Sequence, residues 1–365
     1  YTPVVHILAA VTFIGWLLLG QAEWQVALLY AATVLIITCP CALGLAVPVV
    51  QVLASGKLMR KGILLKSGSA LERLAGITHA VFDKTGTLTA GKPVLISRHT
   101  PEELRQAASI AVHSKHPLAQ AIVKAFDGSV ITLSVTEVQG CGLESGNIKL
   151  GKRSWATNLP DDNDNVMELW MAGHGKPPVR FTFSDILRKD AAQVIRSLTQ
   201  AGIHTALFSG DRLEITRSIA EATGISDHAA ALTPLEKVER IKNFRENGAR
   251  VLMVGDGLND APSLASANIS MSPATAMDIT QNAADIVFHG DKLGPVLTAW
   301  HIARFSQVLV RQNFMLAILY NVFAIPLAVA GYVTPMIAAI AMSSSSLLVI
   351  ANAMRLNTHA DRKAP

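Results

Sequence analysis

Long apolar runs alternate with mixed sequence along the 365-residue chain. A membrane-spanning helix needs about 20 predominantly apolar residues. Four runs approach or exceed this length, at about Val4–Leu19, Trp24–Leu53, Phe314–Val333 and Pro335–Met354. Because the loops within each pair of runs are short, we predict two membrane hairpins, with the second span tilted or broken.

The block between the hairpins alternates short apolar stretches with amphipathic ones. We expect strands at Ile77–Phe82, His204–Phe208, Arg250–Val254 and Asp285–Phe288, and helices at Lys189–Gln200, Arg212–Thr223 and Pro234–Glu246. This alternation predicts a doubly wound parallel α/β sheet. Residues 91–175 interrupt it with a strand pattern of their own, which indicates an inserted domain.

These patterns divide the chain into six parts. We expect a membrane helix pair with a Cys-Pro-Cys segment at 1–54, the sheet domain at 55–90 and 176–300, the inserted domain at 91–175, a second membrane helix pair at 301–356, and a tail at 357–365.

Composition agrees with a protein that lies partly in lipid. Half of the residues are hydrophobic and 16% are charged, against about 25% in soluble domains, and the mean hydropathy is +0.35. The net charge is +5, and Lys57, Arg60 and Arg355 are among the basic residues that flank the runs. The positive-inside rule therefore places the central block and the C-terminus in the cytoplasm.

Other classes find little support in the sequence. It has no basic arm, RNP-like motif or Cys/His finger, so we expect no nucleic-acid partner. Three cysteines are too few for a disulfide framework. An apolar run begins almost at Tyr1 with no basic segment before it, so we predict no signal peptide and expect a fragment.

Several aspartates stand just after predicted strands. Asp83 follows Ile77–Phe82, Asp211 follows His204–Phe208, and Asp256 and Asp260 follow Arg250–Val254. In an open α/β sheet ligands bind beyond the carboxyl ends of the strands, and gathered carboxylates need a hard cation such as Mg²⁺. For Asp211 alone, a helix N-cap is an equally good interpretation.

The predicted chemistry is phosphoryl transfer to Asp83, which can attack a γ-phosphate as a carboxylate nucleophile. We expect Mg²⁺ to be bound by Asp83, Asp256 and the backbone carbonyl of Thr85, with the Lys237 ammonium and the Ser209 hydroxyl on the phosphate oxygens. Thr85 cannot act as an acid or base where related phosphatases carry Asp, so the phosphoenzyme should persist.

The heptapeptide Asp83–Thr89, the Ser209-Gly210-Asp211 turn, Lys237 and the segment Gly255–Pro262 together resemble the P-type ATPases. The resemblance implies a haloacid-dehalogenase-like phosphorylation domain with an inserted α+β nucleotide-binding domain, using ATP and Mg²⁺. It implies catalytic roles for Asp83, Lys84, Thr85, Ser209, Gly210, Asp211, Lys237, Asn259 and Asp260.

Two short motifs lie in the predicted insertion. His116-Pro117 alone is more often a helix start, and Gly140-Cys141-Gly142 alone is usually a turn. In this order they resemble the ATP pocket of the heavy-metal branch, which implies that His116 lies near adenine and that Gly140, Gly142 and Gly151 let the backbone approach the nucleotide. Two positions depart from that pattern, since Ala111 replaces an acidic residue and Lys152 replaces an asparagine.

The second span contains Cys39-Pro40-Cys41. Proline breaks the helix, and unwound backbone at membrane depth is tolerated where it lines a site. Thiolates are soft ligands that suit Cu(I) or Zn(II). The alternative is a pair of buried apolar cysteines beside a structural kink.

The later spans favour copper. Tyr320-Asn321 and Met342 followed by Ser345-Ser346 match the copper(I) branch, and neither span interior carries the ionisable residues expected of a zinc pump. The implied ligands of transported Cu(I) are Cys39, Cys41, Tyr320, Asn321, Met342 and Ser345. Met342 as core filler and the serines as small packing residues are the alternatives.

We therefore expect a copper(I)-transporting ATPase in a bacterial plasma membrane, with the lipid bilayer, ATP and a copper chaperone or acceptor protein as partners. The stretch Cys39–Gln51 looks most like pumps that supply copper to haem–copper oxidases. The alternatives are a zinc or cadmium pump, a membrane-tethered phosphatase and a metal-binding protein without turnover. No Thr-Gly-Glu loop is present, so we expect a fragment without the actuator domain and the early membrane helices.

Overall fold

The computed structural model describes residues 2–39, 41–160, 166–173, 175–256, 260–274 and 284–359. The chain forms two compact units, which we describe separately. The first comprises residues 1–77, 285–288 and 295–365, and the second comprises residues 78–284 and 289–294.

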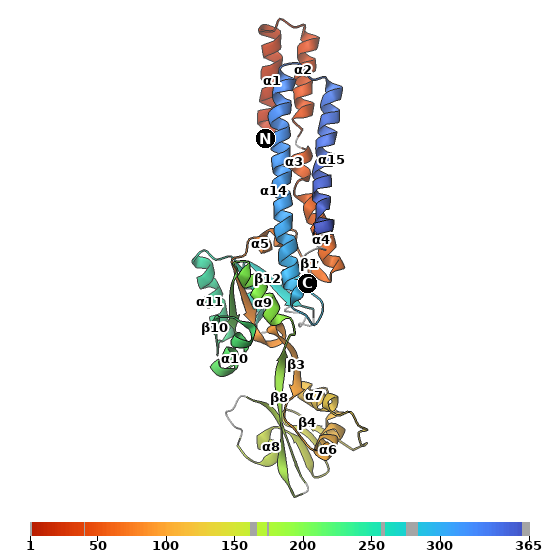
Figure 1. Cartoon of the computed structure of the whole chain (residues 1–365), viewed down its shortest axis with the longest axis vertical. Coiled ribbons are helices and arrows are strands. Elements are labelled where there is room, and N and C mark those ends of the chain that lie inside the picture. The colour runs from red at the N-terminus through yellow and green to blue at the C-terminus, as the bar shows by residue number, and fades with distance from the viewer. Residues whose placement is uncertain are drawn as a thin grey trace. The chain divides into compact units, whose positions relative to one another are not determined.

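The first unit is built from long apolar helices that run side by side (Figure 1). Small and branched side chains fill its interior, with Val34 and Ile37 packed against Ala328 and Ala338. A short antiparallel pair of strands and one small helix complete the unit. Its elements are α1 (Thr2–Leu18), α2 (Trp24–Ile37), α3 (Cys41–Leu45), α4 (Pro48–Arg60), β1 (Ile63–Leu65), α5 (Ser69–Ala75), β13 (Ile286–Phe288), α14 (Gly294–Val329) and α15 (Pro335–His359).

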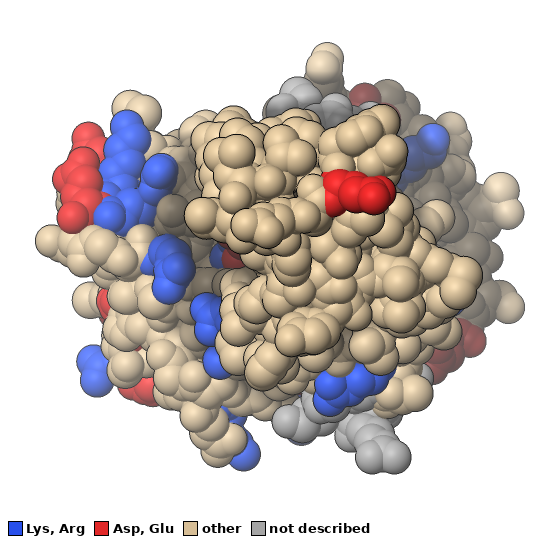
Figure 2. All heavy atoms as spheres, turned by 90° about the horizontal axis from the view of Figure 1, so that it is seen from above, with Lys and Arg blue, Asp and Glu red and all other residues tan. Residues whose placement is uncertain are grey.

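Among the described residues, three helical stretches are long and apolar enough to cross a membrane, namely Trp24–Arg60, Gly294–Val329 and Pro335–Thr358. The predicted first span is a shorter apolar helix, Pro3–Leu18. Figure 2 looks on to the end of the bundle that carries the α1–α2 loop, and the nearest surface is mostly uncharged. Four apolar helices therefore lie where the sequence predicted spans, and α14 begins well before the apolar run at Phe314.

The second span is broken twice. Helix α2 ends at Ile37 and α3 begins at Cys41, so the chain leaves the helix around the Cys-Pro-Cys segment, as a proline there predicts. Pro40 itself lies outside the described residues. A second break separates α3, which ends at Leu45, from α4, which begins at Pro48. The sequence analysis did not predict this second break.

The second unit contains a parallel sheet in the order β12-β11-β2-β9-β10. Val81, Phe208 and Met253 pack against Ile241 and Leu264 from the covering helices. The central strands are buried except at their first residues His79 and His204, which is typical of a parallel sheet with helices on both faces. The elements are β2 (His79–Asp83), β9 (His204–Phe208), β10 (Asp227–Ala229), β11 (Val251–Val254), β12 (Ile269–Pro273), α9 (Ala191–Gln200), α10 (Leu213–Thr223), α11 (Pro234–Glu246) and α12 (Ala261–Ser266).

A second sheet in this unit is antiparallel, with the order β3-β8-β7-β6-β5-β4. Its core is formed by Phe181 and Phe183 packed on Ile110 and Ile122. The sheet continues to Leu187, beyond the predicted end of the inserted domain, and the domain limits stay predictions. Its elements are β3 (Thr89–Leu95), β4 (Thr136–Val138), β5 (Gly142–Ser145), β6 (Ile148–Gly151), β7 (Met167–Gly173), β8 (Lys176–Leu187), α6 (Pro101–Ala111), α7 (Pro117–Ala125) and α8 (Arg153–Thr157).

Asp190 holds the start of α14. Its carboxylate accepts hydrogen bonds from the backbone amides of Leu293, at 2.9 Å, and Gly294, at 2.8 Å. The first amides of a helix have no partner within the helix, and a carboxylate there also interacts favourably with the helix dipole. Asp190 thus caps a helix far along the chain, although it stands directly before α9.

Replacement of Asp190 by Ala should lower the melting temperature. A lost helix cap costs about 1–2 kcal/mol, which corresponds to roughly 2–8 °C for a domain of this size. Thermal unfolding of the purified protein followed by circular dichroism measures the shift. The control is Asp291→Ala, which removes an exposed ion pair with Lys92 and should change the melting temperature very little. Equal shifts in the two variants would contradict the capping role.

Candidate functional site

The ends of three neighbouring strands carry the polar residues of the candidate site. Asp83 is the last residue of β2 and lies opposite Phe208 of β9, so Ser209 follows at the same edge. On the other side, β11 pairs Val254 with Phe82, which places Asp256 just beyond the sheet. The parallel register therefore gathers residues that are far apart in sequence at one edge.

Three carboxylates and one ammonium meet there. Oxygen atoms of Asp83, Asp256 and Asp260 lie within 4.8 Å of one another. The Nζ atom of Lys237 donates to Asp83 at 2.5 Å and to Asp260 at 2.8 Å. Because Asp83, Asp260 and Lys237 are all at least 94% buried, water screens these charges only weakly.

This crowding changes the acidity of the groups. Burial, with the neighbouring Asp260 charge, raises the pKa of Asp83 to about 7, although Lys237 opposes the shift. Burial and the Asp260 charge also raise the pKa of Asp256 to about 7. Burial lowers the pKa of Lys237, but the charges of Asp83 and Asp260 outweigh it, so that its pKa is raised. One ammonium therefore does not fully balance the carboxylates.

The loop after Asp83 is held against Asp256. The backbone amide of Thr85 donates to the Asp83 carboxylate at 3.0 Å. Gly86 has a positive φ of 68°, and a Cβ atom there would coincide with the Asp256 carboxylate. Only glycine fits this position, which explains its place in the heptapeptide in steric terms.

Arg188 holds the same loop through the backbone carbonyl oxygens of the loop. Its guanidinium donates to the carbonyl oxygens of Gly86 at 2.7 Å and Thr87 at 2.8 Å, and more weakly to Thr89. Arg188 is 5% exposed, and burial lowers its pKa, although the charge of Asp256 opposes the shift. The sequence analysis missed Arg188, since a single basic residue after a strand carries no motif.

The remaining predicted catalytic residues lie close by. Lys84 forms an ion pair with Asp211, and the Ser209 hydroxyl accepts from the backbone amide of Asp211 at 3.1 Å. The N-cap of α10 is Arg212, so Asp211 is not the cap of that helix. Gly210 connects Ser209 to Asp211, and Asn259 lies outside the described residues.

The donor set suits Mg²⁺. This ion prefers carboxylate oxygens combined with phosphate oxygens and water, and Asp83, Asp256 and Asp260 offer three carboxylates close together. The raised pKa values of Asp83 and Asp256 show that further positive charge would stabilise the ionised cluster. The residues present therefore fit a divalent cation.

A cavity of about 390 Å³ lies in the antiparallel part of the second unit. It is lined by His116, Gly140 and Gly142 of the predicted nucleotide-binding residues, and also by Cys141 and Lys152. His116 caps α7 by accepting from the backbone amide of Leu118, so the helix-start interpretation also holds locally.

The glycines near this cavity have a packing role. Gly142 pairs with Gly151 across β5 and β6, and a Cβ atom on Gly151 would overlap the Cys141 carbonyl. A Cβ atom on Gly142 would overlap the backbone of Leu150, while Gly140 has open space and a positive φ of 74°. Gly151 does not line the cavity. These glycines therefore have structural reasons that do not require a nucleotide.

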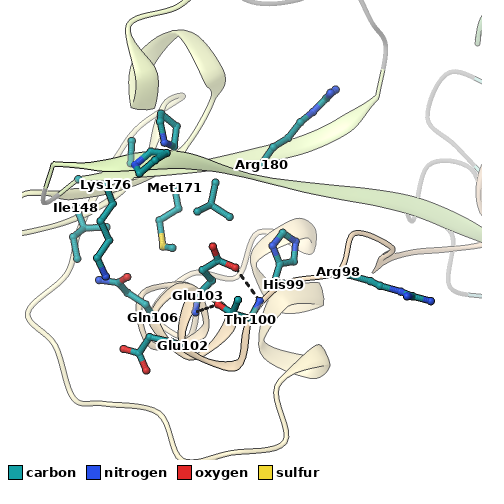
Figure 3. A pocket seen from close by; sticks show the side chains of 15 residues that line it. Arg98, His99, Thr100, Glu102, Glu103, Gln106, Ile148, Met171, Lys176 and Arg180 are labelled. Atoms are coloured by element: carbon teal, nitrogen blue, oxygen red, sulfur yellow. Dashed lines mark hydrogen bonds between the residues drawn. The ribbon is translucent and has the colours of Figure 1, made fainter.

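Figure 3 shows a larger cavity, of about 630 Å³, lined by His99, Glu103, Met171 and Lys176 among others. The start of α6 faces it, but a capping box satisfies the first amides. The Glu103 carboxylate accepts from the Thr100 amide at 2.8 Å, and the Thr100 hydroxyl accepts from the Glu103 amide. This helix end therefore offers less to an anion than an uncapped one, and no residue predicted for nucleotide lines the cavity.

The cysteines of the second span face each other at the first helix break. The Sγ atoms of Cys39 and Cys41 are 2.6 Å apart, and both side chains are half-buried. In an unbroken helix, neighbours two positions apart point in different directions. The break therefore brings both sulfur atoms to one place, and their role as ligands of a shared ion stays a prediction.

Packing contacts bring parts of α14 and α15 beside the second span. Tyr320 packs against the cluster that contains Ile37, two residues before Cys39, and Ala42 packs with Ala317 and Val349. Asn321 Oδ1 is buried without a hydrogen-bond partner among the described residues. Met342 is half-buried and Ser345 is 8% exposed. No contact joins all six residues, so their common role stays a prediction.

Comparison with known proteins identifies the soluble part. A sequence profile of haloacid dehalogenase-like hydrolases matches residues 77–268. Among curated relatives, nitrogen fixation protein FixI of Rhizobium leguminosarum bv. viciae is 49% identical over 368 residues, covering 98% of this chain and 48% of the relative. A probable cation-transporting ATPase of Haemophilus influenzae is 34% identical over 382 residues, covering 98% and 52%.

Solved structures agree with the fold. A zinc-transporting PIB-type ATPase in an E2.Pi state matches with a TM-score of 0.79 and 30% identity, over 98% of this chain and 62% of that one. A catalytic-domain structure of the CPx-ATPase CopB-B, described in terms of conformational changes upon nucleotide binding, matches with a TM-score of 0.56 and 29% identity, over 68% of this chain and 98% of that one. The chain spans about half the length of the curated relatives it matches.

The profile covers more than half of the chain, and the relatives and structures match its membrane helices as well as its sheets. The predicted fold class is confirmed: a haloacid dehalogenase-like domain with a nucleotide-binding insertion accompanies apolar helices that are long enough to span a membrane. This chain belongs to the haloacid dehalogenase-like hydrolases, and over nearly its whole length it is similar to cation-transporting P-type ATPases, among them a PIB-type enzyme.

Proposed function

We propose that this chain carries the phosphorylation site and part of the ion path of an ATP-driven Cu(I) pump in a bacterial plasma membrane. The observation that carries the proposal is the buried Asp83 carboxylate at the end of β2, bonded by Lys237 and crowded by Asp260. Such a carboxylate is a confined nucleophile with a cation beside it, which is the arrangement that phosphoryl transfer requires.

The proposed reaction begins at Asp83. A carboxylate oxygen forms a bond to the γ-phosphorus of ATP, the bond from that phosphorus to the bridging oxygen breaks, and ADP leaves with the electron pair. Lys237 offsets charge on the transferring group, and Ser209 and the Thr85 loop orient it. Mg²⁺ bound by Asp83, Asp256 and the Thr85 carbonyl would supply further positive charge at the phosphate oxygens.

We place the adenine of ATP in the cavity lined by His116, Gly140 and Gly142. Two acidic residues, Glu137 and Glu168, also line it, and Arg180 holds the Glu168 carboxylate at 2.5 Å. A carboxylate can accept a hydrogen bond from the exocyclic amine of adenine. These residues offer such an acceptor although Ala111 stands at the position where the family often has an acid.

Cu(I) is the proposed cargo because the donors at the broken second span are soft. Cys39 and Cys41 offer sulfur, Met342 offers a thioether, and Asn321 Oδ1 has no other described partner. In the proposed cycle, phosphorylation of Asp83 changes the side of the membrane to which these ligands open. A copper chaperone or acceptor protein would then exchange Cu(I) with the pump.

Zinc is the second candidate cargo. One structure with the same fold belongs to a zinc-transporting PIB-type ATPase. Cysteine thiolates bind both Zn(II) and Cu(I), so the choice depends on Met342 and on the absence of charged residues inside the predicted spans at Phe314–Val333 and Pro335–Met354.

Asp83→Asn should abolish the acid-stable phosphoenzyme formed from γ-labelled ATP, because an amide oxygen is a far weaker nucleophile than a carboxylate. The measurement is acid-quenched labelling of the full-length protein. Asp291→Asn, which changes an exposed carboxylate, should label normally. Retained labelling of the Asp83 variant would overturn the proposed nucleophile.

His116→Ala should weaken ATP binding about tenfold, the ratio that 1.4 kcal/mol gives at 25 °C, because the variant loses a ring that lines the smaller cavity. Equilibrium titration with a fluorescent ATP analogue measures the change. His99→Ala in the larger cavity is the matched control and should bind ATP normally. If only the His99 variant loses affinity for ATP, the nucleotide binds in the larger cavity and not in the smaller one.

Cys39→Ser should reduce metal-stimulated ATP hydrolysis by at least about tenfold, because a hydroxyl is a poor ligand for a soft ion. The assay compares Cu(I) with Zn(II) as activator of the full-length protein. Thr33→Val, which removes a buried hydroxyl bonded only within α2, is the control. Full stimulation of the Cys39 variant would remove it from the ligand set, and stimulation of the unaltered protein by Zn(II) alone would replace copper by zinc.

A further inference from the structure

The second break in the second span is held by a side chain from another helix. The backbone leaves the helix at Ala46, between the end of α3 at Leu45 and the start of α4 at Pro48. The Nδ2 atom of Asn313, on α14, donates to the Ala46 carbonyl at 3.3 Å. Asn313 is fully buried, so this bond forms where water does not compete for its partners.

The same asparagine is bonded to α15. Its Oδ1 atom accepts from Asn352 Nδ2 at 2.9 Å, and Asn352 Oδ1 accepts from Arg355 at 2.8 Å. Asn313 and Asn352 thus form a clamp that joins the break to α14 and α15 through two side-chain amides. Neither residue belongs to the predicted ligand set, and neither has a sulfur or charged donor.

Helix α4 is fixed separately on the far side of the break. Lys57 is 4% exposed, and its Nζ atom donates to the carbonyl oxygens of Leu356 at 3.1 Å and Asn357 at 2.6 Å, near the end of α15. A buried ammonium that bonds carbonyls at a helix C-terminus is held strongly. Helix α4 is therefore anchored to α15, and the break is the point at which α3 can change its direction.

There is space beside the break for such a change. A cavity of about 380 Å³ is lined by Val47 and Val50 on one side and by Val310 and Phe314 on α14. Closely packed segments cannot move without displacing their neighbours. Because Val47 borders a cavity, the polar bond of Asn313, rather than packing alone, holds this stretch in place.

We infer that Asn313, bonded to Asn352, is a positioning residue for the cargo: it fixes the Ala46 break and thereby the direction of the short helix α3, which begins with Cys41. The inference rests on the proposed function, since it assigns Cys41 to the ion. If the clamp opens, Cys41 is no longer held opposite Cys39, and the ion binds less tightly.

The test uses Asn313→Leu in the full-length protein. The leucine side chain is nearly the same size as that of asparagine, is favourable in an apolar interior and forms no hydrogen bond. The assay measures the concentration of Cu(I) or Zn(II), whichever stimulates the unaltered protein, at half-maximal phosphorylation from ATP. We expect this concentration to rise about tenfold, the ratio that 1.4 kcal/mol gives at 25 °C. The maximal level should be nearly unchanged. Phosphorylation of Asp83 from inorganic phosphate, which needs no bound cargo, should also stay the same.

Asn352→Leu should produce the same shift, and the double variant should shift no further, because residues that act through one contact are not additive. Thr33→Val is again the control and should leave the half-maximal concentration unchanged. Asn313→Ala repeats the test with less added apolar volume in case the leucine variant does not fold.

The outcomes separate the two proposals. An unchanged half-maximal concentration in variants that still react with inorganic phosphate overturns the clamp and leaves the proposed function in place. Loss of both reactions in Asn313→Leu, Asn352→Leu and Asn313→Ala alike shows that the asparagines only support folding, which also overturns the positioning role. No response of the unaltered protein to either metal overturns the proposed function, and the clamp with it.

Discussion

The ammonium of Lys237, held between the carboxylates of Asp83 and Asp260, is the interaction on which the catalytic end of the sheet depends. Without a cation, several buried carboxylates at this distance would repel one another and remain protonated. Lys237 stands in the first turn of α11, where the capping box of Thr233 and Glu236 fixes the start of the helix. A local helix cap thus sets the position of a charge that the active carboxylate requires.

The buried polar groups of the membrane helices also need partners, and at the breaks these partners are uncharged groups. Charge is costly in lipid, and around the two breaks the described interior of the bundle uses amides, thiols and carbonyl oxygens where the soluble site uses ions. The buried Lys57 ammonium bonds carbonyl oxygens near the end of α15. Each interruption of the second span exposes backbone groups that must find partners. Asn313 supplies one at Ala46, and the sulfur atoms of Cys39 and Cys41 meet at the other break. In the proposed function, one break binds the ion and the other positions the helix that carries Cys41.

Local signals in the sequence predict much of this structure. Helix α11 begins and ends where expected because Thr233-Pro234 and the amphipathic pattern mark it, and α3 begins at Cys41 because Pro40 interrupts the helix. The roles of Arg188 and Asn313 could not be predicted, since each depends on backbone carbonyls more than 90 residues away in the chain. Strand β12 was also missed: Ile269-Ser270-Met271-Ser272 alternates apolar and polar residues, but the run is short and its serines are buried with the rest.

The glycines of the second unit and Asn321 of the first differ in what they indicate about function. Gly86, Gly142 and Gly151 are explained by close approach of backbone or carboxylate, so their presence does not by itself indicate a nucleotide. Asn321 is different, because a buried carbonyl oxygen without a described partner loses the hydrogen bonds that water would give it. A folded protein can tolerate this loss of hydrogen bonds when another group, such as a bound ion, interacts with the oxygen. In the proposed function, the ion bound by Cys39 and Cys41 would be the group that compensates Asn321, while the sulfur donors, and not this amide oxygen, select a soft ion.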